Sequence, residues 1–147
     1  MNSANAFKYA YNKGCRDGLL VYRYGNVERL LKHAKKSISL LKSALPDLKQ
    51  NYTNRLVNNA YFGLGDSYTQ IGNHQAAANN YRQALAYKPD DVEAMLNLAH
   101  NLILVGKPGQ AKKWIMKAKI SGHLSPYGHK VAQTLLKKIN SANSSSQ

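Results

Sequence analysis

Asp66, Ser67 and His100 are the three residue types that serine hydrolases combine as orienting acid, nucleophile and base. Catalysis also requires that the nucleophile reach the base and that hydrogen-bond donors face the reacting carbonyl. Ser67 follows Asp66 directly and therefore points around a helix from it. No strained nucleophile turn accompanies this serine. We therefore expect no catalytic residues and predict that the chain is not an enzyme.

The histidines and the cysteine give no metal-binding pattern. The five histidines do not form the HExxH spacing, and a single cysteine cannot supply a zinc cluster. The same count excludes an internal disulfide. Gly63-Leu64-Gly65 resembles part of a phosphate-binding loop, but no strand precedes it and helix packing explains it. The sequence therefore predicts no metal site and no cofactor.

The most regular feature of the sequence is a repeat, because residues 58–91 recur 34 positions later as residues 92–125. Large apolar residues align with large apolar residues, and small residues align with small ones. The aligned pairs are Tyr61 and Met95, Leu64 and Leu98, Gly65 and Ala99, Tyr68 and Leu102, Gly72 and Gly106, Ala77 and Ala111, Tyr81 and Ile115, and Ala84 and Ala118.

Each copy has the periodicity of two helices joined by a tight turn. Apolar and small residues recur at i, i+3, i+4 and i+7, which is one face of an α-helix. A glycine then ends this pattern, Gly72 in the first copy and Gly106 in the second. A second helical pattern follows, and Pro108 suits the first turn of the second helix in its copy.

On these residues the sequence resembles the tetratricopeptide repeat (TPR) family. The second copy departs from the family pattern at His123, where a closing proline usually stands. The resemblance implies an all-α fold, a right-handed α-solenoid of stacked antiparallel helix pairs. The signature positions that match in the first copy are Tyr61, Leu64, Gly65, Tyr68, Ala77, Tyr81, Ala84 and Pro89.

We predict about seven helices, no strands and a single TPR-like domain over residues 1–140. One helix is expected over 3–24, ended by Gly25-Asn26, and another over 27–45, ended by Pro46-Asp47. The predicted parts are a degenerate helix pair (3–45), the two repeats (58–91 and 92–124), a capping helix (125–139) and a disordered tail (141–147).

The resemblance also implies a concave inner surface formed by the first helix of each pair. Its positions follow the packing stripe by one residue and mix apolar side chains with hydrogen-bonding ones. A peptide or helix of a partner fits such a surface, so we predict an adaptor or assembly scaffold. This prediction includes self-association through the end helices, because solenoid ends present faces that can stack. The predicted groove residues are Asn59, Phe62, Asp66, Thr69, Glu93, Leu96, Asn97, His100 and Ile103.

Two of these groove residues, Asp66 and His100, occupy the same place in neighbouring copies. Adjacent helices pack about 8–10 Å apart, which brings a hydrogen bond or a water bridge between the two side chains within reach. Such a contact would raise the pKa of His100.

The chain is strongly basic, with a net charge of +14 from 21 Lys and Arg against 7 Asp and Glu. A solvated surface is one interpretation of the lysines between Lys107 and Lys138. The alternative is docking to an acidic protein, to an anionic membrane or to nucleic acid. Nucleic acid is disfavoured because lysines dominate over arginines and because aromatic residues do not interleave with them as stacking platforms would. The predicted basic patch comprises Lys112, Lys113, Lys117, Lys119, Lys130, Lys137 and Lys138.

No apolar run approaches the roughly 18 residues of a membrane span, so we expect no transmembrane segment. The first 25 residues lack the uninterrupted apolar centre of a signal peptide. We therefore expect a cytoplasmic protein, or a periplasmic one if a targeting segment is missing from the sequence.

Overall fold

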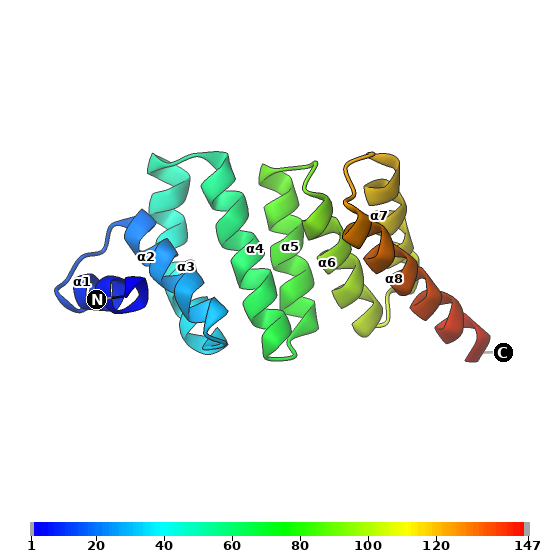
Figure 1. The fold of residues 1–147 in the computed structure, drawn as a ribbon, viewed down its shortest axis with the longest axis horizontal. Helices are drawn as coiled ribbons and strands as arrows, with labels where there is room; N and C mark the ends of the chain where they lie inside the picture. The colour runs from blue at the N-terminus through cyan, green and yellow to red at the C-terminus, as the bar shows by residue number, and fades with distance from the viewer. Residues whose placement is uncertain (1, 146–147) are drawn as a thin grey trace.

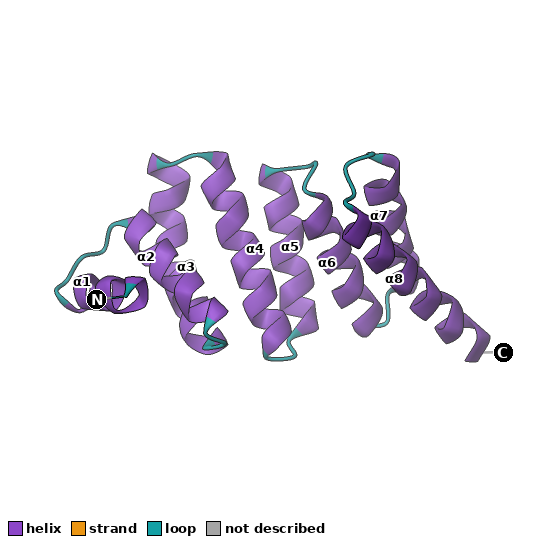
Figure 2. Cartoon of the chain, in the orientation of Figure 1, coloured by secondary structure: helices purple, strands orange, loops and turns teal. Residues whose placement is uncertain are grey.

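The computed structural model describes residues 2–145 as eight α-helices, with no strand in that range (Figure 1, Figure 2). The expected all-α fold is confirmed, with one helix more than the seven or so predicted. The helices are α1 (Ser3–Asn12), α2 (Gly18–Leu30), α3 (Ala34–Asn51), α4 (Asn54–Gln70), α5 (His74–Tyr87), α6 (Val92–Leu104), α7 (Pro108–Ile120) and α8 (Pro126–Ser145).

Helices α2 to α7 stand side by side in a row, each antiparallel to the next, with α1 at one end and α8 at the other (Figure 1). The most extensive contacts join α2 to α3, α4 to α5 and α6 to α7, which makes these the helix pairs of the solenoid. The first helices of successive pairs also contact one another at both ends of the row, α2 with α4 and α6 with α8.

The turns inside the two repeats have the same backbone geometry. Gly72 follows α4 with φ +76°, and Gly106 follows α6 with φ +77°. Glycine adopts this left-handed conformation without steric cost, so each helix ends there and the chain reverses direction. The predicted glycine turns are therefore correct.

Within each repeat, the two helices approach closely at a small residue. A Cβ added to Gly65 would lie 2.8 Å from the ring of Tyr81, so α4 and α5 touch through a glycine and an aromatic ring. In the second repeat the same positions hold Ala99 and Ile115, both fully buried. The close contact between the two helices is therefore formed by Gly65 and Tyr81 in the first repeat and by Ala99 and Ile115 in the second.

The structure corrects the predicted boundaries near the N-terminus. Residues 13–17 separate α1 from α2, and α2 continues through Gly25 and Asn26, where the sequence predicted a break. Gly25 is instead a packing residue, because a Cβ there would lie 2.9 Å from the side chain of Leu41. The chain reverses later, at Lys32, which has φ +64°.

The expected break at Pro46 is also wrong, since this proline lies inside α3. Proline removes one backbone hydrogen bond from a helix interior. Pro46 and Lys42 are both exposed, so the carbonyl left without a donor can bond to water. At the other end α8 continues through residues 141–145, where the sequence predicted disorder, and residues 146–147 of that predicted tail lie outside the described part of the chain.

Candidate partner-binding site

A cavity of about 510 Å³ lies between the first turns of α6 and α8. It combines an apolar floor with a polar rim, and three of the predicted groove residues belong to it. The lining residues are Val92, Glu93, Leu96, Asn97, His123, Leu124, Ser125, Tyr127, Gly128 and Val131.

Two equivalent helix caps set the position of this cavity. The Asp91 carboxylate accepts a hydrogen bond from the Ala94 backbone N–H at 3.1 Å and begins α6. The Ser125 hydroxyl oxygen, 34 residues later, accepts one from the Gly128 N–H at 3.0 Å and begins α8. Side-chain acceptors at this position satisfy N–H groups that the first helical turn leaves unpaired. Helix α8 therefore continues the repeat in phase, in the place of the first helix of a fourth pair.

The cavity offers both apolar contact and a negative charge. Leu96 forms its buried floor at 6% exposure, with the half-buried Val92 and Val131 beside it. Glu93 is exposed, and it is the one acid among the residues that line the cavity. Tyr127, at 76% exposure, presents a large ring to solvent at the mouth. Such a site can hold an apolar side chain next to a cationic one.

The groove predicted from the sequence does not include the residues that α8 contributes to this cavity, although the 34-residue period extends that far. Glu93 corresponds to Tyr127 and Asn97 corresponds to Val131 at that spacing. Continuing the alignment past residue 125 would have placed Tyr127 and Val131 on the inner surface.

Two predicted apolar contacts, Phe62 and Leu96, are less accessible than expected. Leu96 is buried in the core because α8 packs over it. Phe62 is half-buried, and the edge of one ring meets the face of the other where it packs on Tyr81, with centroids 5.3 Å apart. Ile103 and Asn59 are also half-buried, and Ile103 packs against the same core.

The expected contact between Asp66 and His100 is not present. The Asp66 carboxylate instead accepts a hydrogen bond from the Arg29 guanidinium of α2 at 2.6 Å, which forms an ion pair. Burial, followed by the nearby charges of Lys138 and His74, lowers the pKa of His100. The predicted rise in this pKa is therefore wrong, because the acid that would cause it is paired elsewhere.

The hydrolase arrangement considered from residue types does not form either. Ser67 is fully buried, and its hydroxyl donates to the Ser37 hydroxyl oxygen at 3.0 Å. A serine held in a helix interface cannot reach a substrate carbonyl. Among residues 2–145 no three His, Cys, Asp or Glu side chains are grouped closely enough to hold a metal ion.

Thr69 lies in a hydrogen-bond network that links the two repeats. Its hydroxyl donates to the Gly65 carbonyl at 2.9 Å and contacts the side-chain oxygen of buried Asn101 at 3.2 Å. The same oxygen lies 2.8 Å from His74 Nδ1. Thr69 therefore supports the interface between the repeats, which limits its availability to a partner.

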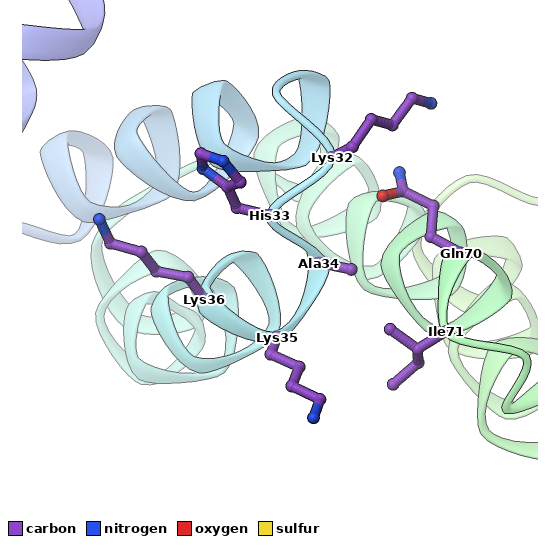
Figure 3. Close-up of a pocket in the computed structure, with 7 residues that line it drawn as sticks. All are labelled: Lys32, His33, Ala34, Lys35, Lys36, Gln70 and Ile71. Carbon is purple, nitrogen blue, oxygen red and sulfur yellow. The ribbon is translucent and has the colours of Figure 1, made fainter.

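A second hollow, of about 550 Å³, lies at the turn between α2 and α3 (Figure 3). Lys32, Lys35 and Lys36 border it, but Figure 3 shows these side chains pointing in different directions. Lys36 Nζ donates to Glu28 at 2.9 Å, and His33 Nδ1 lies 2.6 Å from the same carboxylate. The cations therefore do not converge on one point where an anion would bind.

The lysines of the predicted basic patch are exposed and divide between two helices. Lys112, Lys113, Lys117 and Lys119 lie on α7, and the other three lie on α8. None of the seven lines the cavity between α6 and α8. Within the described residues, no helix is both long enough and apolar enough to cross a membrane.

Solved structures with the same fold extend these findings. A chain of the crystal structure of the APC/C hetero-tetramer Cut9-Hcn1 is 19% identical with a TM-score of 0.78, over 90% of this chain and 25% of that one. MamA 41-end from Desulfovibrio magneticus RS-1 is 15% identical with a TM-score of 0.71, over 81% of this chain and 64% of that one. A chain of the CopN-Scc3 complex is 18% identical with a TM-score of 0.67, over 89% of this chain and 74% of that one.

This chain thus spans only a quarter of the Cut9-Hcn1 chain and about two thirds of the MamA chain. No curated protein matches the sequence. Residues 59–102, which run from α4 into α6, match the family model described as TPR repeat. The prediction from the 34-residue period is confirmed over these residues, which form a TPR repeat, and the fold of the chain is a TPR-like helical solenoid.

Proposed function

We propose that the chain is a non-enzymatic protein-interaction module, an adaptor or scaffold that holds a segment of a protein partner on the inner side of the solenoid. The cavity between α6 and α8 is the observation that carries this proposal. An apolar side chain of the partner enters over Leu96 and Val131, and the segment lies against Tyr127 at the mouth.

The charge of the cavity indicates which segment fits. Glu93 is the one acid among the lining residues, and its carboxylate is exposed. A lysine or arginine next to the apolar anchor would pair with this carboxylate, and Asn97 would hydrogen-bond to the backbone of the segment. We therefore expect the partner to present an apolar residue flanked by a basic one.

The similar structures support a role in assembly at the level of the fold. One of them is a chain of the hetero-tetramer Cut9-Hcn1, and another is a chain of the CopN-Scc3 complex. Helical repeat solenoids commonly present extended concave surfaces of this kind to partners. Groove residues nearer the N-terminus, such as Asp66 and Phe62, are engaged within the chain, so we place the binding site at the C-terminal end of the inner side.

The test is partner capture with variants of exposed cavity residues. Glu93→Lys combined with Tyr127→Ala removes the acid and the ring at the mouth without touching a buried side chain. We expect the partners captured by the wild-type chain, identified by mass spectrometry, to be retained at least about tenfold less by this variant.

The matched control is Asp90→Lys, which makes the same charge change at an exposed position outside the cavity. It should leave capture unchanged. If the cavity variant retains its partners as the wild type does, or if Asp90→Lys releases them equally, the cavity is not the binding site. Leu96→Glu is unsuitable because Leu96 is buried in the core.

A further inference from the structure

The outward side of α7 combines exposed apolar side chains with lysines. Ile120 is 81% exposed and Met116 is 39% exposed, one helical turn apart. Lys112, Lys113 and Lys117 surround them along a shallow hollow that also includes Gly109. Solvent contact is unfavourable for large apolar side chains, so their placement among lysines at the surface suggests an interaction.

The equivalent helix of the first repeat shows that packing does not require this surface. Helix α5 shares with α7 a buried stripe of two alanines and one large residue, and it buries Ala78 and Leu85 in addition. The outward positions of α5 hold Asn79, Arg82, Gln83 and Ala86. The corresponding residues of α7, 34 positions later, are Lys113, Met116, Lys117 and Ile120. The two apolar residues and the lysines are thus specific to α7.

No acid balances the charge of this region. Glu93 is the last acidic residue of the sequence, and residues 94–147 carry eight lysines. The electrostatic field at the α7 surface is therefore positive, and it favours an anionic partner.

We propose that the outward face of α7 docks on an anionic lipid membrane surface. Lys112, Lys113 and Lys117 contact the negative headgroups, while Ile120 and Met116 enter the boundary between headgroups and acyl chains. Lysine stems bury their methylene groups and keep the ammonium groups at the level of the headgroups. The residues of this face do not line the α6–α8 cavity, so the proposal stands independently of the partner-binding site.

A membrane fits this face better than an acidic protein or a nucleic acid does. Ile120 protrudes from the helix, and a deformable lipid surface can accept a protruding side chain without a matching pocket. Recognition of nucleic acid typically relies on arginine and on stacked aromatic rings. The one nearby ring, Trp114, is half-buried with Lys117 Nζ placed 5.1 Å from its centroid. Arg82 of α5 lies beside Lys113 and Lys117, but it is half-buried and donates a hydrogen bond to Gln110 at 3.0 Å.

The test uses the full chain with phosphatidylcholine vesicles that contain or lack phosphatidylserine, in a flotation assay. We expect binding to the anionic vesicles only, with a steep loss as salt is raised. Each lysine near such a surface contributes about fivefold. Lys112→Gln, Lys113→Gln and Lys117→Gln together should therefore weaken binding by roughly two orders of magnitude. Ile120→Gln, which leaves the charge unchanged, should weaken it severalfold.

A charge-matched control removes three exposed lysines elsewhere, with Lys35→Gln, Lys42→Gln and Lys88→Gln. It should retain most of the binding, and circular dichroism should show the same helicity in all variants. The proposal is overturned if the control weakens binding as much as the α7 variant does, if Ile120→Gln has no effect, or if the wild type fails to float with anionic vesicles. Binding of the wild type to DNA or polyglutamate in preference to the vesicles would also overturn it.

Discussion

Helices α5 and α7 occupy equivalent places in successive repeats, and they agree on one side while differing on the other. Their buried stripes are Ala77, Tyr81 and Ala84 in α5 and Ala111, Ile115 and Ala118 in α7, all at most 2% exposed. Their outward faces differ, since that of α5 is mainly neutral and polar while that of α7 carries several lysines and large apolar residues. The contrast separates what the fold requires from what it leaves free.

The buried side is constrained because each side chain there must fit the helix opposite. A methyl group added or removed at such a contact changes the packing of both helices. The outward side has few contacts within the chain, so most of its residues can change with little penalty to the fold. A difference between repeats on that side therefore carries information about function, and a difference on the buried side must be compensated by its neighbour.

The largest expected effect concerns that compensation. Gly65→Ala places a methyl group against the Tyr81 ring and should lower the free energy of unfolding by about 1–3 kcal/mol, measured by urea denaturation. Adding Tyr81→Ile recreates the Ala99 and Ile115 pair of the second repeat. The double variant should be less destabilised than the sum of the two single variants.

Gly109→Ala is the matched control, because the space around that Cβ is open. It should be neutral or slightly stabilising, since alanine favours the helix by up to about 1 kcal/mol. Additive effects of Gly65→Ala and Tyr81→Ile would show that the two repeats do not share this packing solution.

A loss of stability of similar size, but dependent on pH, is expected in the first helix pair, where Glu28 stands at the position of Tyr68 and Leu102. Burial acts to raise the pKa of Glu28, but hydrogen bonds from Lys36 and His33 outweigh it, and the pKa is lowered below its ordinary value of 4.5. Its contribution to stability is therefore present above about pH 4.5 and is lost as the pH falls through the lowered pKa.

Glu28→Gln should reduce the free energy of unfolding at pH 7 by about 1–3 kcal/mol, because a charged hydrogen-bond acceptor is lost from a buried site. The loss should shrink when both proteins are compared at pH 3. An equal difference between the two proteins at pH 3 and pH 7 would contradict the ionic role of Glu28.

The smallest expected effect is on the pKa of His100, on the inner surface of the second repeat. At the equivalent position of the first repeat Asp66 pairs with Arg29, whereas the charge of Lys138 acts on His100. Burial is the main cause of the lowered pKa of His100, and the charge of Lys138 adds to it. Lys138→Gln should raise this pKa modestly, as measured by NMR titration of the imidazole, while Lys137→Gln should change it less. A pKa that responds equally to both substitutions would exclude a specific effect of Lys138.

The 34-residue period made the two central helix pairs predictable, because glycine turns and alternating large and small residues leave little choice of fold. The first pair was harder, since its equivalents lie 40 residues before those of the first repeat. At that spacing Gly25 and Leu41 correspond to Gly65 and Tyr81, and Lys32 occupies the turn position of Gly72. A lysine with positive φ gives no turn signal, and a packing glycine was interpreted as a helix end.

The candidate site was less predictable than the fold, for a physical reason. Position on a helix predicts which face a residue occupies, but it does not tell whether a later helix covers that face. Leu96 lies on the expected side of α6 and is nevertheless buried by α8. Asp66 likewise lies on the expected side, and its ion pair with Arg29 depends on a helix whose alignment the sequence did not show.

Asn58 connects the first repeat to the start of the second through hydrogen bonds. Its buried amide donates to the Ala84 carbonyl at 2.9 Å and to the Asp91 carboxylate at 3.1 Å, and so ties the first repeat to the start of the second. The equivalent position of the second repeat holds Val92, a half-buried apolar residue that lines the cavity between α6 and α8. Directional hydrogen bonds of Asn58 therefore help to set the placement of α6 after the first repeat, and no asparagine stands at the equivalent position of the second repeat.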